Sequence, residues 1–153
     1  MKKVIIYTDG AARGNPGPAG AGVVFCNEKN QPIRKHGKYL GDDLTNNEAE
    51  YQAVIFALEK FKAVFSKKVA KETEITVRSD SQLLVNQIEA KYKIENERIG
   101  KLFLEIWNLK QDFKKVKFKH IKRNKNKDAD RLANEAIDRE EGKQSLFEEK
   151  DKD

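Results

Sequence analysis

The stretch "VIIYTDGAARGNPGPAG" (residues 4–20) is the most informative part of the sequence for the fold. In it an apolar run ends on a carboxylate and is followed by a segment rich in glycine and proline. The run before Asp9 is typical of a strand that is covered on both faces of a sheet. Glycine and proline let the following loop stay rigid and approach a ligand closely, which keeps Asp9 accessible at its base. A dinucleotide-binding turn is excluded, since the loop continues into the strand-like residues 22–25 and such a turn needs a helix there.

The rest of the sequence predicts an α/β fold built on this first strand. A hairpin is expected over residues 22–41, a helix over 47–65, a strand over 72–80, two helices over 83–88 and 99–113, a strand over 116–120 and a helix over 128–138. The order is three strands, a helix, a strand, two helices, a strand and a helix. Helical crossovers make the first, fourth and fifth strands parallel. We therefore predict a five-stranded mixed sheet with helices on both faces.

Length and composition indicate a single domain with a polyanionic partner. The chain has 153 residues, a hydrophobic content of 38% and a formal net charge of +6. Residues 114–127, "KKVKFKHIKRNKNK", contain eight basic residues and no acidic one, so the positive charge is local. The single cysteine, Cys26, and the absence of a long apolar run predict a reducing, cytoplasmic location without membrane contact.

Four carboxylates are candidates for a metal site. Asp9 and Asp80 end two strands expected to be neighbours, and helical geometry directs Glu50 and Asp130 beside the core-facing stripes of their helices. Each also has a structural interpretation: turn formation for the two strand-end residues, a capping box opened by Asn47 for Glu50, and a helix-dipole role for Asp130. A cluster of all four requires cations, and hard oxygen ligands suit Mg²⁺ or Mn²⁺. Two such ions form an arrangement that cleaves phosphodiesters.

Four segments together resemble the signature segments of type 1 ribonuclease H, in that family's order. They are "YTDGAARGNPGPAGAG", "TNNEAEYQAV", "VRSDSQLLV" and "NKDADRLANEAID". The resemblance implies the ribonuclease H-like fold and an endoribonuclease that hydrolyses the RNA strand of RNA–DNA hybrids, leaving 5′-phosphate and 3′-hydroxyl ends. It implies that two Mg²⁺ ions, replaceable by Mn²⁺, are bound by the catalytic residues Asp9, Glu50, Asp80 and Asp130.

The same resemblance suggests how substrate is held. Asn15, Asn47 and Gln82 would face the minor groove and contact RNA sugars, and Thr45 with Asn96 would hold a phosphate of the DNA strand. Helix capping is the alternative role for Asn46 and Asn47. Further electrostatic contacts with the hybrid are expected from three basic residues: Arg13, Lys122 and Arg123.

The chain also departs from the family pattern. Many members carry a histidine in a flexible loop before the last helix, whereas here His120 continues the alternation of the last strand and is assigned to it. A basic insertion and a separate hybrid-binding domain are not expected. Lys91, Lys93 and the basic run at 114–127 are the available electrostatic substitutes, and a solvated strand edge guarded by lysines is the alternative role of the run.

Two rival functions remain at this point: another nuclease of the same fold, and a hybrid-binding module that lost its chemistry. The first would lack "GNPGPAG" and "TNNEAE", and the second predicts at least one missing carboxylate.

The C-terminal end of the sequence is expected to lie outside the catalytic domain. We predict a monomer with a catalytic domain over 1–141 and a disordered, charged tail over 142–153. Within that tail, Leu146 and Phe147 either fold back onto the domain or dock into a partner. The "SLF" core loosely resembles peptides that bind the bacterial sliding clamp.

Overall fold

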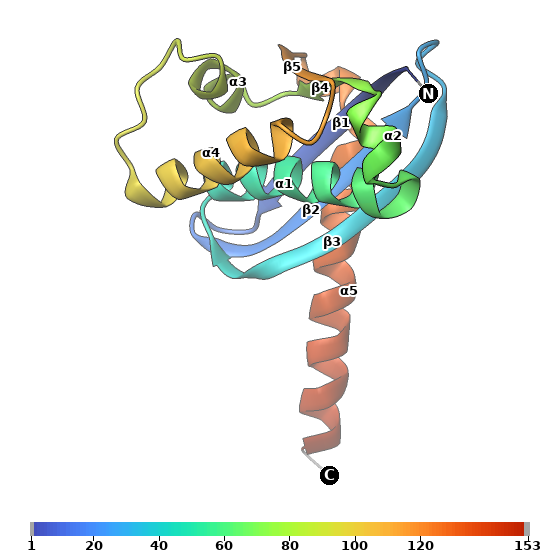
Figure 1. Cartoon of the computed structure of the whole chain (residues 1–153). Coiled ribbons are helices and arrows are strands. Elements are labelled where there is room, and N and C mark those ends of the chain that lie inside the picture. The colour runs from blue at the N-terminus through green and yellow to red at the C-terminus, as the bar shows by residue number, and fades with distance from the viewer. Residues whose placement is uncertain (1, 152–153) are drawn as a thin grey trace.

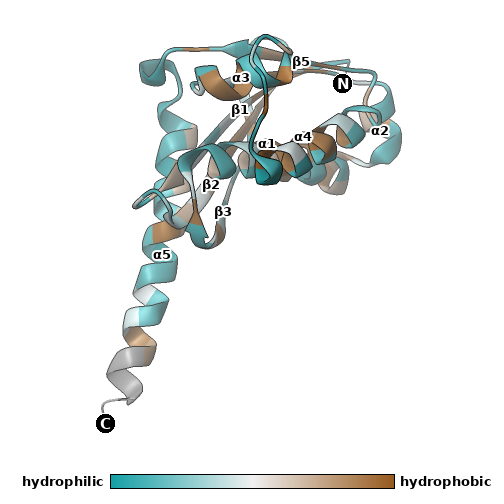
Figure 2. Ribbon diagram, turned by 90° about the vertical axis from the view of Figure 1, so that its left-hand side faces the viewer, coloured by the Kyte–Doolittle hydropathy of each residue, from teal (hydrophilic) through white to brown (hydrophobic). Residues whose placement is uncertain are grey.

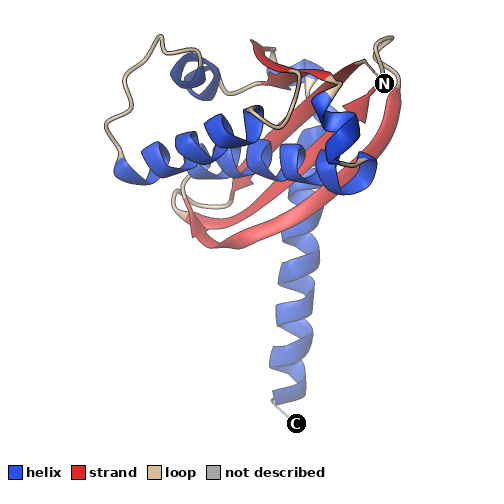
Figure 3. Cartoon of the chain, in the orientation of Figure 1, coloured by secondary structure: helices blue, strands red, loops and turns tan. Residues whose placement is uncertain are grey.

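The computed structural model of the chain describes residues 2–151, and its helices and strands are distinguished by colour in Figure 3. The strands are β1 (Lys3–Ala12), β2 (Gly17–Cys26), β3 (Pro32–Leu44), β4 (Glu74–Ser79) and β5 (Lys115–His120). The helices are α1 (Asn46–Phe65), α2 (Lys67–Lys71), α3 (Gln82–Ile88), α4 (Glu97–Lys110) and α5 (Lys127–Asp151), with a 3-10 turn η1 (Arg123–Lys125) before α5.

The five strands form one mixed sheet in the order β3-β2-β1-β4-β5. The hairpin strands β2 and β3 pair antiparallel, and β4 runs parallel to both β1 and β5. Helices α1, α2 and α4 cover one face of the sheet and α5 crosses the other (Figure 1). The predicted fold class and the parallel arrangement of the first, fourth and fifth strands are confirmed.

Each face of the sheet is packed by a different kind of side chain. Large apolar residues fill the space between the sheet and α1, including the fully buried Ile6, Leu58 and Phe61. On the opposite face, α5 presents small residues and lies so close to β2 that a Cβ atom added at Gly22 would sit 1.9 Å from the carbonyl oxygen of Ala129. Only glycine fits at this contact, and this contact fixes the position of the first turn of α5.

The glycine- and proline-rich segment is more regular than predicted. Strand β1 continues past Asp9 to Ala12 and pairs with β2 as far as Ala19, so only residues 13–16 form the connecting turn. The pairing of residues 10–12 with residues 19–21 explains the difference, because small residues on both strands permit a close antiparallel ladder. Asp9 is therefore held within a paired strand, not at a strand end.

The C-terminal segment also differs from the prediction. The tail expected to be disordered from residue 142 is helical, and α5 extends away from the sheet to Asp151 (Figure 2). One glycine in a helix interior costs only about 1 kcal/mol relative to alanine, and most neighbouring residues are good helix formers. The fold-back interpretation of Leu146 and Phe147 is wrong, since their exposed fractions are 61% and 68%. The division into a catalytic domain and a separate tail stays a prediction.

Among residues 2–151, none of the helices has both the length and the apolar character needed to cross a bilayer.

Candidate active site

An open cavity of about 620 Å³ lies at the carboxyl ends of β1 and β4, the edge at which α/β sheets bind ligands. It is bounded by the turn after β1, the first turn of α1, the start of α3 and the first turn of α5. All four predicted carboxylates line it, together with Asn15, Asn47 and Arg123. The tertiary structure thus gathers side chains that are separated by as many as 121 positions in the sequence.

Three of the carboxylates form a tight group. Oxygen atoms of Asp9, Glu50 and Asp80 all lie within 4.8 Å of one another. Asp9 and Glu50 are only 5% and 8% exposed, and Asp80 is half-buried. Burial, and then repulsion from Glu50 and Asp80, strongly raises the pKa of Asp9, and burial likewise raises the pKa of Glu50. A bound cation would oppose both shifts, because an adjacent positive charge favours the charged forms of Asp9 and Glu50.

Glu50 is fixed by the elements on either side of it. The backbone N–H of Gly10 donates to its Oε1 at 3.0 Å, and the Ser79 hydroxyl donates to its Oε2 at 3.3 Å. A Cβ atom at Gly10 would lie 2.1 Å from the carbonyl oxygen of Ala49, so glycine is required for α1 to approach β1. This close approach brings Glu50 to Asp9 and Asp80.

Asp130 completes the site from the first turn of α5. It lines the same cavity but is exposed, and it lies near enough to Asp9 to contribute to the raised pKa of that residue. Its position in the first helical turn is also favourable for the helix dipole, so the two roles predicted for it are compatible.

Asn126 is a site residue that the sequence analysis missed. Its side chain is 1% exposed, and its Nδ2 donates to the carbonyl oxygen of Thr8 at 2.8 Å and to Asp80 Oδ2 at 3.4 Å. The backbone carbonyl oxygen of Asn126 accepts the N–H of Asp130. It therefore connects the strand before Asp9, the Asp80 carboxylate and the helix of Asp130. The available signal was its place at the start of "NKDADRLANEAID".

The residues fit a divalent metal ion. Three carboxylates with grouped oxygens, and a fourth on the cavity rim, provide hard oxygen ligands of the kind preferred by Mg²⁺ and Mn²⁺. Without a cation, burying two of these charges side by side is costly. The chemistry of the donor set therefore supports the predicted metal.

The predicted sugar-contacting residues differ in their placement. Asn15 and Asn47 line the cavity, and Asn15 Oδ1 accepts the N–H of Asn46, which joins the β1–β2 turn to the start of α1. Asn47 Nδ2 donates to Gln87 at 3.5 Å, and its buried Oδ1 has no partner among the described residues. Gln82 is exposed at the start of α3.

The two predicted phosphate contacts, Thr45 and Asn96, are both helix N-caps. Thr45 Oγ1 accepts the N–H of Glu48, and the Glu48 side chain accepts the N–H of Thr45, which completes a capping box. Asn96 Oδ1 accepts the N–H of Ile99. The capping interpretation placed on Asn46, Asn47 and Glu50 is therefore wrong, because Thr45 opens the box and Glu48 closes it.

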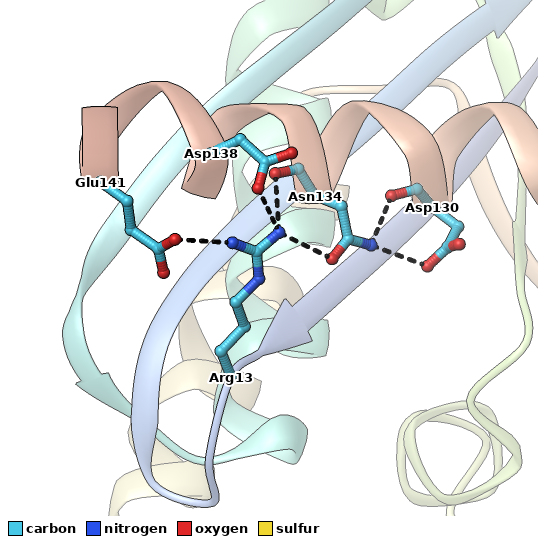
Figure 4. A network of polar contacts seen from close by, with 5 residues as sticks. All are labelled: Arg13, Asp130, Asn134, Asp138 and Glu141. Atoms are coloured by element: carbon cyan, nitrogen blue, oxygen red, sulfur yellow. Dashed lines mark hydrogen bonds and ion pairs between the residues drawn. The ribbon is translucent and has the colours of Figure 1, made fainter. Parts of the chain in front are cut away.

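The predicted electrostatic contacts separate into two groups. The Arg13 guanidinium is turned toward α5, where it pairs with Asp138 at 2.6 Å and Glu141 at 3.0 Å (Figure 4). Lys122 and Arg123 are exposed, and Arg123 lines the cavity. His120 is the exposed last residue of β5, which confirms its assignment to that strand.

Comparisons with known proteins agree with this architecture. A family profile described as reverse transcriptase-like matches residues 7–136. Ribonuclease HI of Halobacterium salinarum is 36% identical over 136 residues, which are 89% of this chain and 65% of that protein. A bifunctional protein of Mycobacterium tuberculosis is 35% identical over 136 residues, or 89% of this chain and 36% of that protein. The chain thus spans about a third of the length of the first curated relatives it matches.

Among solved structures, LC11-RNase H1, isolated from compost by a metagenomic approach, is 45% identical with a TM-score of 0.82, covering 91% of this chain and 98% of that one. A crystal structure of LC11-RNase H1 in complex with RNA/DNA hybrid gives a TM-score of 0.83 and 44% identity, covering 89% and 97% of the two chains.

Proposed function

Because this chain belongs to the type 1 ribonuclease H family, we propose that it hydrolyses the RNA strand of RNA–DNA hybrids and leaves 5′-phosphate and 3′-hydroxyl ends. The observation that carries the proposal is the gathering of Asp9, Glu50, Asp80 and Asp130 around one open cavity at the carboxyl edge of the sheet. The hybrid-bound structure of a relative at 44% identity supports the same substrate class.

Two Mg²⁺ ions, replaceable by Mn²⁺, are the proposed cofactors, because two divalent ions balance four carboxylates. When bound, such a pair activates a water molecule and stabilises the leaving oxygen. The protein holds the ligands in place beforehand: strand pairing fixes Asp9, Gly10 and Ser79 orient Glu50, and Asn126 orients Asp80. Metal binding therefore requires little rearrangement of these three side chains.

The proposed hybrid interface surrounds this cavity. Asn15 and Asn47 line it and carry amides suited to the 2′-hydroxyl, which distinguishes RNA from DNA, and Gln82 stands exposed at its side. Thr45 and Asn96 use their oxygens to cap helices, which leaves the Thr45 hydroxyl hydrogen and the Asn96 amide nitrogen to donate to a DNA phosphate. Lys122 and Arg123 supply positive charge beside the cavity.

The two rival functions are less well supported. A module without chemistry would tolerate the loss of a carboxylate, whereas all four are present and gathered. Another nuclease of the same fold is disfavoured by 45% identity to LC11-RNase H1 across 91% of the chain.

Three further expectations belong to the proposal. The single free thiol of Cys26 is buried, which suits a reducing cytoplasm, and the site is built from one chain, which suits a monomer. The exposure of Leu146 and Phe147 leaves both side chains available for docking to a sliding clamp. A pull-down with purified clamp, compared with the Leu146→Ala, Phe147→Ala double variant, tests the docking.

The function is tested by incubating the protein with labelled RNA–DNA hybrid, double-stranded RNA and double-stranded DNA, with Mg²⁺ or with chelator. We expect cleavage of the hybrid alone and only with metal. Asp80→Asn is the matched control, because it removes one ligand charge with little change of shape. Equal cleavage of double-stranded DNA, or full activity of Asp80→Asn, would contradict the proposal.

A further inference from the structure

Asp130 is the one member of the four carboxylates that is exposed, and a side chain from the next turn of α5 holds it. Asn134 Nδ2 donates to the carbonyl oxygen of Asp130 at 3.0 Å and to its Oδ1 at 3.2 Å (Figure 4). The other three carboxylates are buried or half-buried and lie in one tight group. Asn134 therefore holds the Asp130 carboxylate, which has less surrounding protein to fix its position than the other three.

The orientation of the Asn134 amide is set by Arg13, which comes from the turn between β1 and β2. Arg13 Nη2 donates to the backbone carbonyl oxygen of Asn134 at 3.3 Å and lies 3.5 Å from its side-chain Oδ1. A guanidinium is only a donor, so it must face the amide oxygen, which turns the amide NH₂ toward Asp130. The guanidinium itself is held by two α5 carboxylates, Asp138 and Glu141.

The network of Arg13 with Asn134, Asp138 and Glu141 contributes little to the free energy of unfolding. The side chains of Asp138 and Glu141 are 64% and 49% exposed, and exposed ion pairs contribute about 0–1 kcal/mol. The network instead joins two parts of the site: the turn that carries Arg13 also carries Asn15, and the helix that receives it carries Asp130.

We propose that Asn134 is a positioning residue for Asp130, and that Arg13 holds Asn134 in the orientation this requires. The proposal rests on the proposed function, because Asp130 must be a metal ligand for its position to matter. Partners that orient metal ligands commonly change metal affinity or activity by about 10–100-fold when removed. Since Asp130 is exposed, we expect an effect of about tenfold, the lower end of that range.

The experiment uses the full chain with Asn134→Ala, Arg13→Ala and the double variant. Mn²⁺ affinity is measured from the loss of the free-ion electron paramagnetic resonance signal, a readout that needs no turnover. Steady-state cleavage of labelled hybrid gives kcat and KM. Arg131→Ala is the matched control, because Arg131 lies on the same helix and its ion-pair partners are Glu135 and Asp128, whereas Asp130 is held by Asn134.

We expect Asn134→Ala to weaken Mn²⁺ binding and to lower kcat by about tenfold, with KM unchanged. Arg131→Ala should match the wild type. The Arg13→Ala, Asn134→Ala double variant should lose no more Mn²⁺ affinity or kcat than Asn134→Ala alone. In an Asp130→Asn background, Asn134→Ala should have no further effect on Mn²⁺ affinity.

Wild-type Mn²⁺ affinity in Asn134→Ala, or additive losses with Arg13→Ala or with Asp130→Asn, would overturn the proposal. A wild-type protein that binds Mn²⁺ but does not cleave hybrid would instead refute the proposed function, while the binding series would still decide the role of Asn134.

Discussion

Replacing Gly22 with alanine should separate α5 from the sheet and disable the site at the same time. Gly22 pairs directly with Asp9 across the β1–β2 ladder, and it lies beneath Ala129, the residue before Asp130. An added Cβ atom would lie 1.9 Å from the carbonyl oxygen of Ala129 and 2.8 Å from the nitrogen of Ala133. These are backbone atoms, so no change of rotamer can relieve the contact.

The loss of stability expected for Gly22→Ala follows from the short distance between the added Cβ atom and the carbonyl oxygen of Ala129. Ordinary contact with a Cβ atom begins near 3.4 Å, so the first turn of α5 must withdraw by about 1.5 Å. Overpacking a core costs about 1–3 kcal/mol, and a contact with rigid backbone belongs at the upper end, about 3 kcal/mol. For a chain of this size, that loss lowers the melting temperature by about 6–12 °C. Misplacing a catalytic group by about 1 Å can cost about 100-fold in rate, so we expect at least that loss of turnover.

The assay is urea unfolding of metal-free protein followed by circular dichroism, with cleavage measured at a temperature where the variant remains folded. Gly100→Ala is the matched control. Gly100 lies inside α4, and an added Cβ there would meet no atom within 4 Å. The same chemical change should therefore stabilise the protein by up to about 1 kcal/mol. A Gly22→Ala protein that unfolds within about 0.5 kcal/mol of the wild type and retains its turnover would refute the argument.

Three other outcomes are expected. Asp9→Asn should abolish hybrid cleavage and raise the melting temperature in chelator at pH 7. Folding raises the pKa of Asp9, so the wild type loses stability as the pH rises above the ordinary pKa of an aspartate. The gain in melting temperature should therefore vanish near pH 4, and a gain that persists there would be inconsistent with this cause. His120→Ala should leave turnover within a few-fold of the wild type, since His120 is an exposed strand residue; a loss of about 100-fold at unchanged melting temperature would reassign it to catalysis. Deleting residues 143–153 should change neither melting temperature nor cleavage, because Leu146 and Phe147 are exposed, and a lowered melting temperature would show a packing role.

Much of the fold and the four carboxylates could be predicted from the sequence, because these depend on local patterns. The apolar run before Asp9 predicts a strand, and the helical spacing around Glu50 predicts a helix. Short crossover connections then restrict the sheet to few topologies. The helical continuation past Gly142 was missed, since one glycine weakens a helix without ending it.

The supporting contacts of the site could not be read in this way, because they join residues far apart in the chain. Asn126 meets Thr8 across 118 positions, and Arg13 meets Asn134 across 121. Local patterns suggested Arg13 as a contact for nucleic acid and Asn47 as a cap, whereas packing directed Arg13 to α5 and left capping to Thr45.

The sequence by itself determined which residues carry the charge of the site and in which elements they lie. Only the tertiary structure decided how differently those carboxylates are held: Asp9 in β1 and Glu50 in α1 are buried where these two elements meet, whereas Asp130 is exposed at the start of α5. The physical reason is that burial and repulsion depend on distances between elements. Those distances are set by close backbone contacts such as Gly10 with Ala49 and Gly22 with Ala129, which no local periodicity records.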